Sequence, residues 1–274
     1  NIPCVHTYHT MYEDYLHYIA NGKLLKPVHV KQISRSFLQN MNGIIAPSDR
    51  VLTTLRGYGV TEPITVIPPG VDLAKSSKAD QVDYRKKYAI AADTPLLLTL
   101  SRLAYEKNID QLIDAFVRIK EQLPAAKLMI CGDGPAREDL ENQVKRLHLT
   151  GSVIFTGEIS NDQVPHYYHM ANLFVSTSVS ESQGLTYNEA LASGLKVVTT
   201  HSPYTDELLD QVCLGKTYST VDEFVSDVVE YLKHPEKYRN EKVLAQKLKS
   251  ISAENFGKRV IHFYEHCIDE YQHS

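Results

Sequence analysis

The sequence predicts an α/β protein built on parallel β-sheets. Short apolar segments recur along the 274 residues, and amphipathic helical patterns separate most of them. Strands that alternate with helices of about 10 to 15 residues form right-handed βαβ units, whose strands are parallel. The hydrophobic content of 43% and the charged content of 23% are ordinary for a globular protein. The expected strands are Pro3–Thr7, Ile44–Ala46, Thr65–Ile67, Leu96–Leu100, Lys127–Cys131, Val153–Phe155, Leu173–Ser176 and Lys196–Thr200.

The first expected strand ends beside two histidines, His6 and His9. Loops at the carboxyl ends of an open α/β sheet line its ligand crevice. His9 lies further toward that end, so it is the better candidate for a site residue. An imidazole there can donate a hydrogen bond to developing charge. For His6, His166 and His169, a capping or core role is the favoured interpretation.

The segment MYEDYLHYIANGKLLKPVHVKQISRSF mixes aromatic, aliphatic and basic residues. Aromatic rings beside cations suit the headgroup zone of an anionic membrane. A helix that packs on the sheet with its lysines in solvent explains the pattern equally well. The apolar positions are Tyr12, Tyr15, Leu16, Tyr18 and Ile19, and the cations that follow are Lys23, Lys26, Lys31 and Arg35.

A linker is expected from Pro68 to Asp83, in a stretch rich in Pro, Ser and Lys. Two prolines in a row do not fit inside a regular helix or a central strand. The first sheet is therefore predicted to end at this point, and a second domain to follow.

The segment SRLAYEKNID follows the strand Leu96–Leu100 directly and precedes an amphipathic helix around Leu112–Ile119. Arg102 and Lys107 therefore project from a strand-to-helix turn. Arginine suits bidentate phosphate contacts, and lysine acts as a mobile point charge. As isolated residues they would be ordinary surface cations, whereas beside a second anion-binding turn they form a diphosphate clamp.

The motif GDGP follows the strand Lys127–Cys131, and its glycines permit a tight turn. A lone G-x-G is weak evidence for phosphate binding, and a structural turn explains it as well. Gly132 is therefore only a secondary candidate for a ligand contact.

The segment SVSESQGLTYNEALASG supplies the second anion-binding turn. An apolar strand precedes Gly184, and a helical run from Tyr187 to Ser193 follows it. A helix N-terminus reached through a glycine turn presents free N–H groups to an anion. Glu181 and Glu189 are placed to hold hydroxylated rings near a diphosphate. A capped helix with two solvated acids is the alternative.

The rest of the chain restricts the class of protein. Helices are expected from Val221 to Lys233 and from about Ala253 to Tyr271. The net charge of −4 gives no reason to propose a nucleic-acid partner. The four cysteines are far apart and read as reduced thiols of a cytosolic protein. Neither a bilayer-spanning run nor a signal peptide is visible.

These segments carry a family resemblance. SRLAYEKN resembles the Arg…Lys donor-phosphate motif of retaining glycosyltransferases of the GT-B type, family 4 (glycosyl transferases group 1). SESQGLTYNEALASG resembles the E-x7-E motif of that family. IIAPSDRVLTTL, ITVIPPGVD, LMICGDGP and VIFTGEIS also match in order, between about Ile44 and Thr200. VHTYHTMYEDYLHYI is similar to the bacterial 1,2-diacylglycerol 3-glucosyltransferases within the family.

The resemblance implies the GT-B fold, with two Rossmann-like, doubly wound parallel-sheet domains. It implies that residues 1–75 belong to the N-terminal, acceptor-side domain and residues 76–252 to the domain that binds the nucleotide-sugar donor. Residues 253–274 would form a helix that returns to the first domain. Because the chain starts at Asn1 directly in a strand pattern, the first part of the N-terminal domain is expected to be absent.

The resemblance also implies an activity, transfer of glucose from UDP-glucose to 1,2-diacylglycerol with retention of configuration. No metal or cofactor would be needed, because Arg102 and Lys107 neutralise the departing diphosphate. Glu181 would hold sugar hydroxyls, Glu189 the ribose, and His9 would lie near the transferred sugar. The donor contacts implied are Arg102, Lys107, Gly132, Glu181, Gly184, Leu185 and Glu189, and the residues implied in catalysis are His9, Arg102, Lys107 and Glu181.

Other functions stay open. The same fold serves other acceptors, such as a cell-wall sugar, inositol phosphate or a glycolipid. A nucleotide-sugar-binding protein or an epimerase would transfer nothing. A lipid acceptor would place the protein at the anionic, cytoplasmic face of a membrane as a peripheral protein. The chain as it stands is expected to bind UDP without transferring sugar, and to self-associate through its incomplete first sheet.

Overall fold

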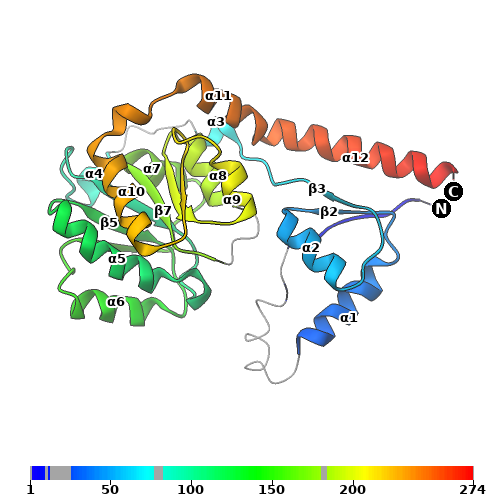
Figure 1. Cartoon of the computed structure of the whole chain (residues 1–274), viewed down its shortest axis with the longest axis horizontal. Helices are drawn as coiled ribbons and strands as arrows, with labels where there is room; N and C mark the ends of the chain where they lie inside the picture. The colour runs from blue at the N-terminus through cyan, green and yellow to red at the C-terminus, as the bar shows by residue number, and fades with distance from the viewer. Residues whose placement is uncertain (1, 10–11, 13–25, 77–82, 180–183, 274) are drawn as a thin grey trace. The chain divides into compact units, whose positions relative to one another are not determined.

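The computed structural model describes residues 2–9, 12, 26–76, 83–179 and 184–273 (Figure 1). Their backbone forms two compact units. Among the described residues, the first unit takes those up to Gly70 and those from Ile251 onward. The second unit takes the residues from Val71 to Ser250.

The first unit is built on a parallel sheet that has three strands in the described part of the chain, in the order β1–β2–β3. Apolar residues of β2, including Ile44 and Ile45, are almost fully buried. In the described part of the chain, helix α1 (Pro27–Leu38) precedes β2 and helix α2 (Asp49–Gly57) follows it, and Leu38 and Leu55 of these helices close the core beneath the sheet. The elements are β1 Val5–Thr7, α1 Pro27–Leu38, β2 Gly43–Ala46, α2 Asp49–Gly57 and β3 Ile64–Val66.

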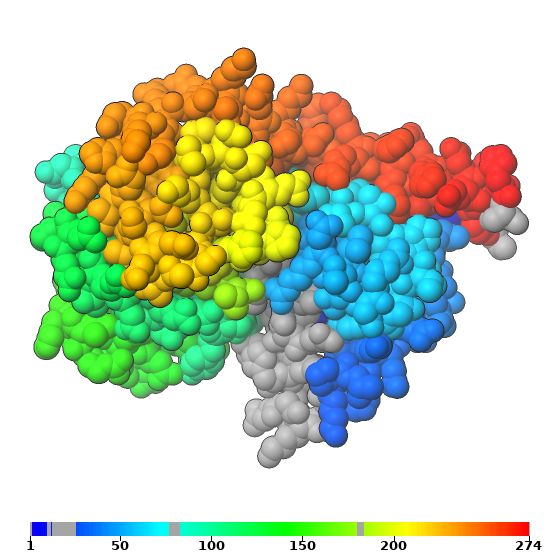
Figure 2. All heavy atoms as spheres, viewed as in Figure 1, coloured from blue at the N-terminus to red at the C-terminus, as the bar shows by residue number. Residues whose placement is uncertain are grey.

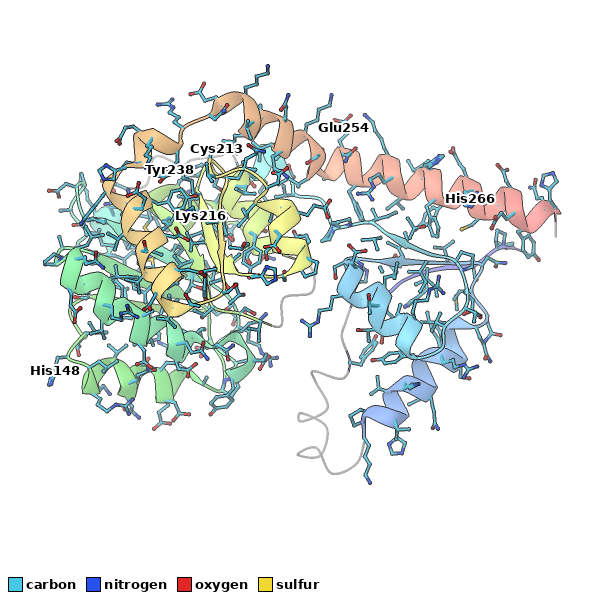
Figure 3. All side chains as sticks on the ribbon, in the orientation of Figure 1. His148, Cys213, Lys216, Tyr238, Glu254 and His266 are labelled. Atoms are coloured by element: carbon cyan, nitrogen blue, oxygen red, sulfur yellow. The ribbon has the colours of Figure 1, made fainter. Side chains whose placement is uncertain are left out.

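Helix α12 (Ala253–His273) packs on this sheet. Phe263 and Cys267 are buried against Ile45 and Ile67, because the two helix residues lie one turn apart on the same face. The exposed residues of α12 include intrahelical charge pairs, such as Lys258 with Glu254 at 2.5 Å. They also include the apolar side chains of Ile261 and Ile268. Figure 3 labels Glu254 near the start of this helix.

The second unit is built on a parallel sheet that has six strands among the described residues, in the order β6–β5–β4–β7–β8–β9. The chain starts at β4 in the middle, moves outward to β6, and then returns to pair β7 with β4 on the other side. That reversal is a topological switch point, and ligands of doubly wound folds bind outside the carboxyl ends of the strands there. The strands are β4 Leu96–Leu100, β5 Lys127–Cys131, β6 Val153–Gly157, β7 Leu173–Ser176, β8 Val197–Thr200 and β9 Gly215–Tyr218.

Helices cover this sheet, and α5 and α6 (green) form part of the surface of the unit in Figure 2. Helix α5 is amphipathic, and its Leu112, Phe116 and Ile119 are fully buried. The helical elements of the unit are α3 Leu73–Ser76, α4 Tyr84–Lys87, η3 Tyr105–Lys107, α5 Ile109–Gln122, α6 Arg137–Arg146, α7 Val164–Met170, α8 Leu185–Ala192, α9 Pro203–Leu208, α10 Val221–Lys233, η4 Pro235–Tyr238 and α11 Glu241–Ser250.

The predicted strands are confirmed, three of them (β4, β5 and β7) with the same bounds. The ninth strand, Gly215–Tyr218, was not predicted, because GKTY has no apolar run. It pairs with β8 and occupies an edge of the sheet. Strand β3 begins one residue earlier than predicted, at Ile64.

Most of the aromatic segment after β1 lies outside the described residues, Tyr15 to Lys23 among them. Tyr12 is 52% exposed and its ring contacts the ring of Tyr8 edge-on. Lys26, Lys31 and Arg35 are exposed, the last two on α1. These positions fit both the membrane interpretation and the packed-helix interpretation.

Candidate functional site

The candidate site lies on the second unit, at the switch point between β4 and β7. The two strands are direct neighbours, with Leu97 opposite Leu173 and Leu98 opposite Phe174. The loop after β4 carries Arg102 and Lys107, and the chain after β7 leads to Gly184. Because the strands are parallel, both loops leave from the same edge of the sheet.

A hydroxyl joins these two loops. Thr177, just after β7, donates from Oγ1 to the carbonyl of Asn108 at 2.8 Å and lies 3.3 Å from that of Lys107. The side-chain amide of Asn108 donates from Nδ2 to the Thr177 carbonyl at 3.4 Å. Asn108 has a left-handed backbone, with φ of 50°, which turns the chain from η3 into α5. The position of Lys107 is therefore set from β7 as well as from β4.

Arg102 and Lys107 occupy different surroundings in the first loop. Arg102 is exposed and pairs with Glu106, with 3.7 Å between Nη2 and Oε1. Lys107 is partly buried, at the end of η3. The Arg102 side chain is 43% exposed and its distance to Glu106 is long for an ion pair, so the pairing is weak and an anionic ligand can compete for the guanidinium.

The GDGP loop after β5 packs directly on the Arg102 loop. Leu103 donates its N–H to the Asp133 carbonyl at 2.9 Å. A Cβ on Gly132 would lie 1.9 Å from the Ser101 carbonyl oxygen, and φ at this residue is 130°. The N–H of Gly132 donates to Gly157, at 2.9 Å, so this amide is used within the unit. Gly132 thus allows the close approach of the two loops, and its predicted contact with a ligand stays a prediction.

Gly184 starts helix α8. Its backbone is left-handed, with φ of 63°, and its carbonyl accepts from the N–H groups of Tyr187 and Asn188. A Cβ here would lie 2.1 Å from the ring of Tyr204, which packs over the glycine. The Tyr204 hydroxyl donates to Asn188 at 3.1 Å and fastens the ring to the helix. The first turn of α8, with Leu185 at 38% exposure, has N–H groups that no helical carbonyl can reach.

Glu189 lies one turn into α8, as predicted, and is partly buried. The hydroxyl of Tyr168 lies 3.1 Å from its Oε2 atom. Burial raises the pKa of the Glu189 carboxyl, against the opposing effects of Tyr168 and of Lys75 on α3. The carboxyl therefore takes up a proton at a higher pH than a solvated glutamate does.

Neither Glu181 nor His9 belongs to the described residues of the second unit. Glu181 lies outside the described residues. His9 follows β1 in the first unit and is exposed. The structure thus brings Arg102, Lys107, Gly184 and Leu185 to one edge of one sheet. Sequence reasoning missed Thr177, Tyr168 and Tyr204, since each acts through a contact that the local pattern does not encode. It also missed Glu106, which pairs with Arg102 four residues before it.

The structural roles predicted for three histidines are confirmed. His6 packs edge-on against Phe37, with 5.0 Å between ring centroids, and burial lowers its pKa. His166 is buried and stacks on Tyr84 at 4.8 Å. His169 donates from Nε2 to the carbonyl of Ser76 at 2.8 Å and joins α7 to α3.

The described residues contain neither a metal-binding cluster nor a membrane-spanning helix. No three side chains of His, Cys, Asp or Glu are placed there to share a metal ion. No helix in that part of the chain has the length and apolar character to cross a bilayer. The thiols of Cys4, Cys131, Cys213 and Cys267 are all free.

Two family models match the chain. The model for glycosyl transferases group 1 matches residues 80–247. The model for glycosyltransferase family 4 matches residues 1–75.

Known proteins of similar sequence and structure were also found. The chain is 42% identical, over 96% of its length, to an alpha-monoglucosyldiacylglycerol synthase of Streptococcus pneumoniae, of which it covers 60%. It is 30% identical, over 86% of its length, to the Acholeplasma laidlawii protein of the same description, of which it covers 62%. The chain thus spans about three fifths of the length of these relatives. The solved structure of Anabaena HepE in complex with UDP-glucose superposes with a TM-score of 0.79 at 18% identity, over 96% of this chain and 72% of HepE.

Proposed function

The chain belongs to the glycosyl transferases group 1 family, and from this membership we propose that it binds a nucleoside-diphosphate sugar and serves glycosyl transfer to a lipid. Its fold is GT-B, so the predicted fold class is confirmed. The observation that carries the proposal is the switch point of the second unit, where a loop with two cations and the N-terminus of α8 leave neighbouring strands.

The charges of the site support a diphosphate as the ligand. Arg102 and Lys107 supply two positive charges, and the N-terminus of α8 adds N–H donors at Gly184 and Leu185. Together they stabilise the negative charge that builds on a departing nucleoside diphosphate, the task that a metal ion performs in other transferases. HepE binds UDP-glucose, which supports uridine as the base and glucose as the sugar here.

Three further residues complete the proposed machinery. Glu189 accepts hydrogen bonds from the ribose hydroxyls, Glu181 holds hydroxyls of the sugar, and His9 donates to the sugar or its phosphate during transfer. Gly132 supports the loop of Arg102. We propose retention through attack on the face from which the diphosphate leaves, assisted by that diphosphate, with no protein nucleophile and no cofactor.

The acceptor that we propose is 1,2-diacylglycerol, through its 3-hydroxyl. Both similar sequences are described as alpha-monoglucosyldiacylglycerol synthases, which supports a lipid acceptor. A lipid acceptor stays in the bilayer, so the protein would work as a peripheral protein at the anionic cytoplasmic face of a membrane. Basic positions such as Lys31 and Arg35 on the exposed side of α1 suit that surface.

The test is a transfer assay with a longer protein that contains this sequence, because the 274 residues by themselves are expected to bind UDP without transferring sugar. Radiolabelled UDP-glucose is offered with diacylglycerol in anionic vesicles, with soluble sugars and with inositol phosphate. Glucosyl-diacylglycerol with the α configuration is the expected product. Transfer to a soluble acceptor and to no lipid would contradict the proposed lipid acceptor. Binding without transfer to any acceptor would favour a nucleotide-sugar-binding protein, and conversion of the donor sugar an epimerase.

Replacing Glu189 by glutamine is expected to weaken UDP binding by about tenfold or more, because a hydrogen bond to a charged group contributes roughly 1.5–3 kcal/mol. Calorimetric titration of the 274-residue chain with UDP measures the change. Glu121→Gln, at an exposed position at the far end of α5, makes the same change of charge and should bind UDP as the unmodified chain does. Equal affinity of Glu189→Gln and this control would remove Glu189 from the site.

UDP binding is expected to be insensitive to chelation, because side-chain cations and helix N–H groups neutralise the diphosphate. The dissociation constant of UDP should be the same in EDTA and in excess magnesium or manganese, within twofold. Calorimetry in the three buffers tests this. A requirement for either metal would contradict the metal-free site.

A further inference from the structure

A buried tyrosine joins helices α7 and α8. Tyr168 on α7 is 1% exposed, and its hydroxyl lies 3.1 Å from Glu189 Oε2 and 3.1 Å from the Thr186 carbonyl. A phenol has one proton to donate, so it serves one of these two oxygens at a time. An ionised carboxylate is the stronger acceptor, whereas a protonated carboxyl leaves the phenol proton to the carbonyl.

Tyr168 has little freedom to leave this position. Its ring packs on Phe174 of β7, with 5.7 Å between centroids. The C-terminal end of helix α7 is held by two hydrogen bonds, because Arg85 donates to the Met170 carbonyl at 2.8 Å and His169 donates to the Ser76 carbonyl at 2.8 Å. The hydroxyl is therefore held between the two acceptors by the packing of the unit.

We propose that Tyr168 is a positioning residue, which holds Glu189 ionised and turned so that Oε1 is left to accept hydrogen bonds from the ribose of the donor. In the ionised state the Tyr168 proton points to Oε2 and fixes the plane of the carboxylate. When Glu189 is protonated, the phenol donates to Thr186 instead, and the carboxyl loses both its charge and its orientation. The role rests on the proposed function, since it assumes that Glu189 binds the donor.

The groups around Glu189 determine the pH at which its carboxyl is protonated. Burial raises its pKa, while Tyr168 from α7 and Lys75 from α3 act in the opposite direction. Lys75 is exposed and also interacts with Asp162. Helix α11 packs on α8 as well, and its Lys247 is engaged by Asp210 at 2.9 Å. Removing the Tyr168 hydroxyl takes away a donor to the charged form, so the carboxyl should gain its proton at a higher pH.

The first experiment needs no ligand. The NMR chemical shift of the Glu189 carboxyl carbon is followed against pH in the unmodified chain. The signal is assigned because it is missing from the spectrum of Glu189→Gln. Tyr168→Phe is expected to raise the midpoint by about one pH unit, the effect of losing one charge-assisted hydrogen bond. Tyr167→Phe is the matched control, because this neighbour is equally buried and its hydroxyl contacts Tyr88 at 2.8 Å instead. An unchanged midpoint in Tyr168→Phe, with a folded protein by thermal unfolding, would overturn the proposal.

The dependence on ionic strength distinguishes the effects of Tyr168 and Lys75 on the pKa of Glu189. Lys75→Met should raise the midpoint only at low ionic strength, because salt screens an exposed charge. The effect of Tyr168→Phe should persist at high salt, because a buried hydrogen bond is not screened. A Tyr168→Phe effect that salt abolishes would count against a direct hydrogen bond.

The second experiment follows UDP affinity against pH. Affinity of the unmodified chain should fall on acidification through the Glu189 midpoint, and in Tyr168→Phe the fall should begin about one pH unit higher. Failure of the unmodified chain to bind UDP would contradict the proposed function and leave the NMR result standing. UDP binding with the same pH profile in both proteins would contradict the positioning role alone.

Discussion

Removing both cations of the site, in Arg102→Met with Lys107→Met, is expected to lower UDP affinity by at least about a hundredfold. Each contact between a cation and a phosphate contributes roughly 1.5 kcal/mol or more, and each 1.4 kcal/mol is a factor of ten. The single variants should each lose about tenfold, with the larger loss at Arg102, because a guanidinium can contact two phosphate oxygens at once. Calorimetry with UDP measures all three proteins.

The double variant also changes the net charge of the protein by two units, which weakens its attraction for any anion. A second double variant controls for this effect. Lys145→Met with Arg146→Met makes the same change of charge at exposed positions in the last turn of α6. This control should bind UDP within about twofold of the unmodified chain, because the last turn of α6 is at the opposite end of the helix from Ala136, whose N–H donates to the Leu103 carbonyl, and salt screens exposed charges. Equal losses in the two double variants would show that Arg102 and Lys107 act only through the overall field.

Replacing Gly132 by alanine is expected to cost about 3 kcal/mol of unfolding free energy and much of the UDP affinity. The new Cβ would lie 1.9 Å from the Ser101 oxygen, on a backbone whose φ of 130° disfavours any side chain. Ser101 cannot yield cheaply, because its own N–H donates to the Cys131 carbonyl at 3.1 Å. A shift of this segment would carry Arg102 with it, so binding should suffer beyond the loss of stability.

Chemical unfolding measures the first effect, and calorimetry on the folded fraction measures the second. Gly151→Ala is the matched control in the same unit, because a Cβ there would meet nothing within 4 Å. Its stability should stay within about 0.5 kcal/mol of the unmodified chain. A Gly132→Ala protein as stable as this control would mean that the two loops separate at no cost.

The sequence was most informative where local pattern and tertiary role coincide. LLLTL, KLMIC and LFVS consist mostly of apolar residues, and they became central strands with both faces covered. GKTY became the edge strand β9 through its pairing with Val197–Thr200, and that pairing depends on where β8 lies. Helix α8 begins at Leu185, two residues before the predicted run, because Gly184 turns the chain earlier.

The sequence predicts which loops form the site better than it predicts the side-chain contacts within it. Arg102, Lys107 and Gly184 follow strands, so their place at the sheet edge follows from topology alone. Tyr168 meets Glu189 because two helices pack side by side, and no spacing along the chain encodes that meeting. Whether Glu181 and His9 serve the donor stays a prediction, since Glu181 lies outside the described residues and His9 belongs to the other unit.

The bond from Thr177 to the carbonyls of Asn108 and Lys107 has a consequence for how this protein can diversify. A substitution that reshapes the turn before α5 also disturbs the end of β7, so the two segments are inherited as one module. Substitutions that change the donor preference should therefore occur at side chains outside these hydrogen bonds, such as Leu185. Exchange of one loop alone should be a rarer route. A mutant library that randomises residues 102–108 should vary position 177 in the same clones, because paired changes there are accessible when single changes are not.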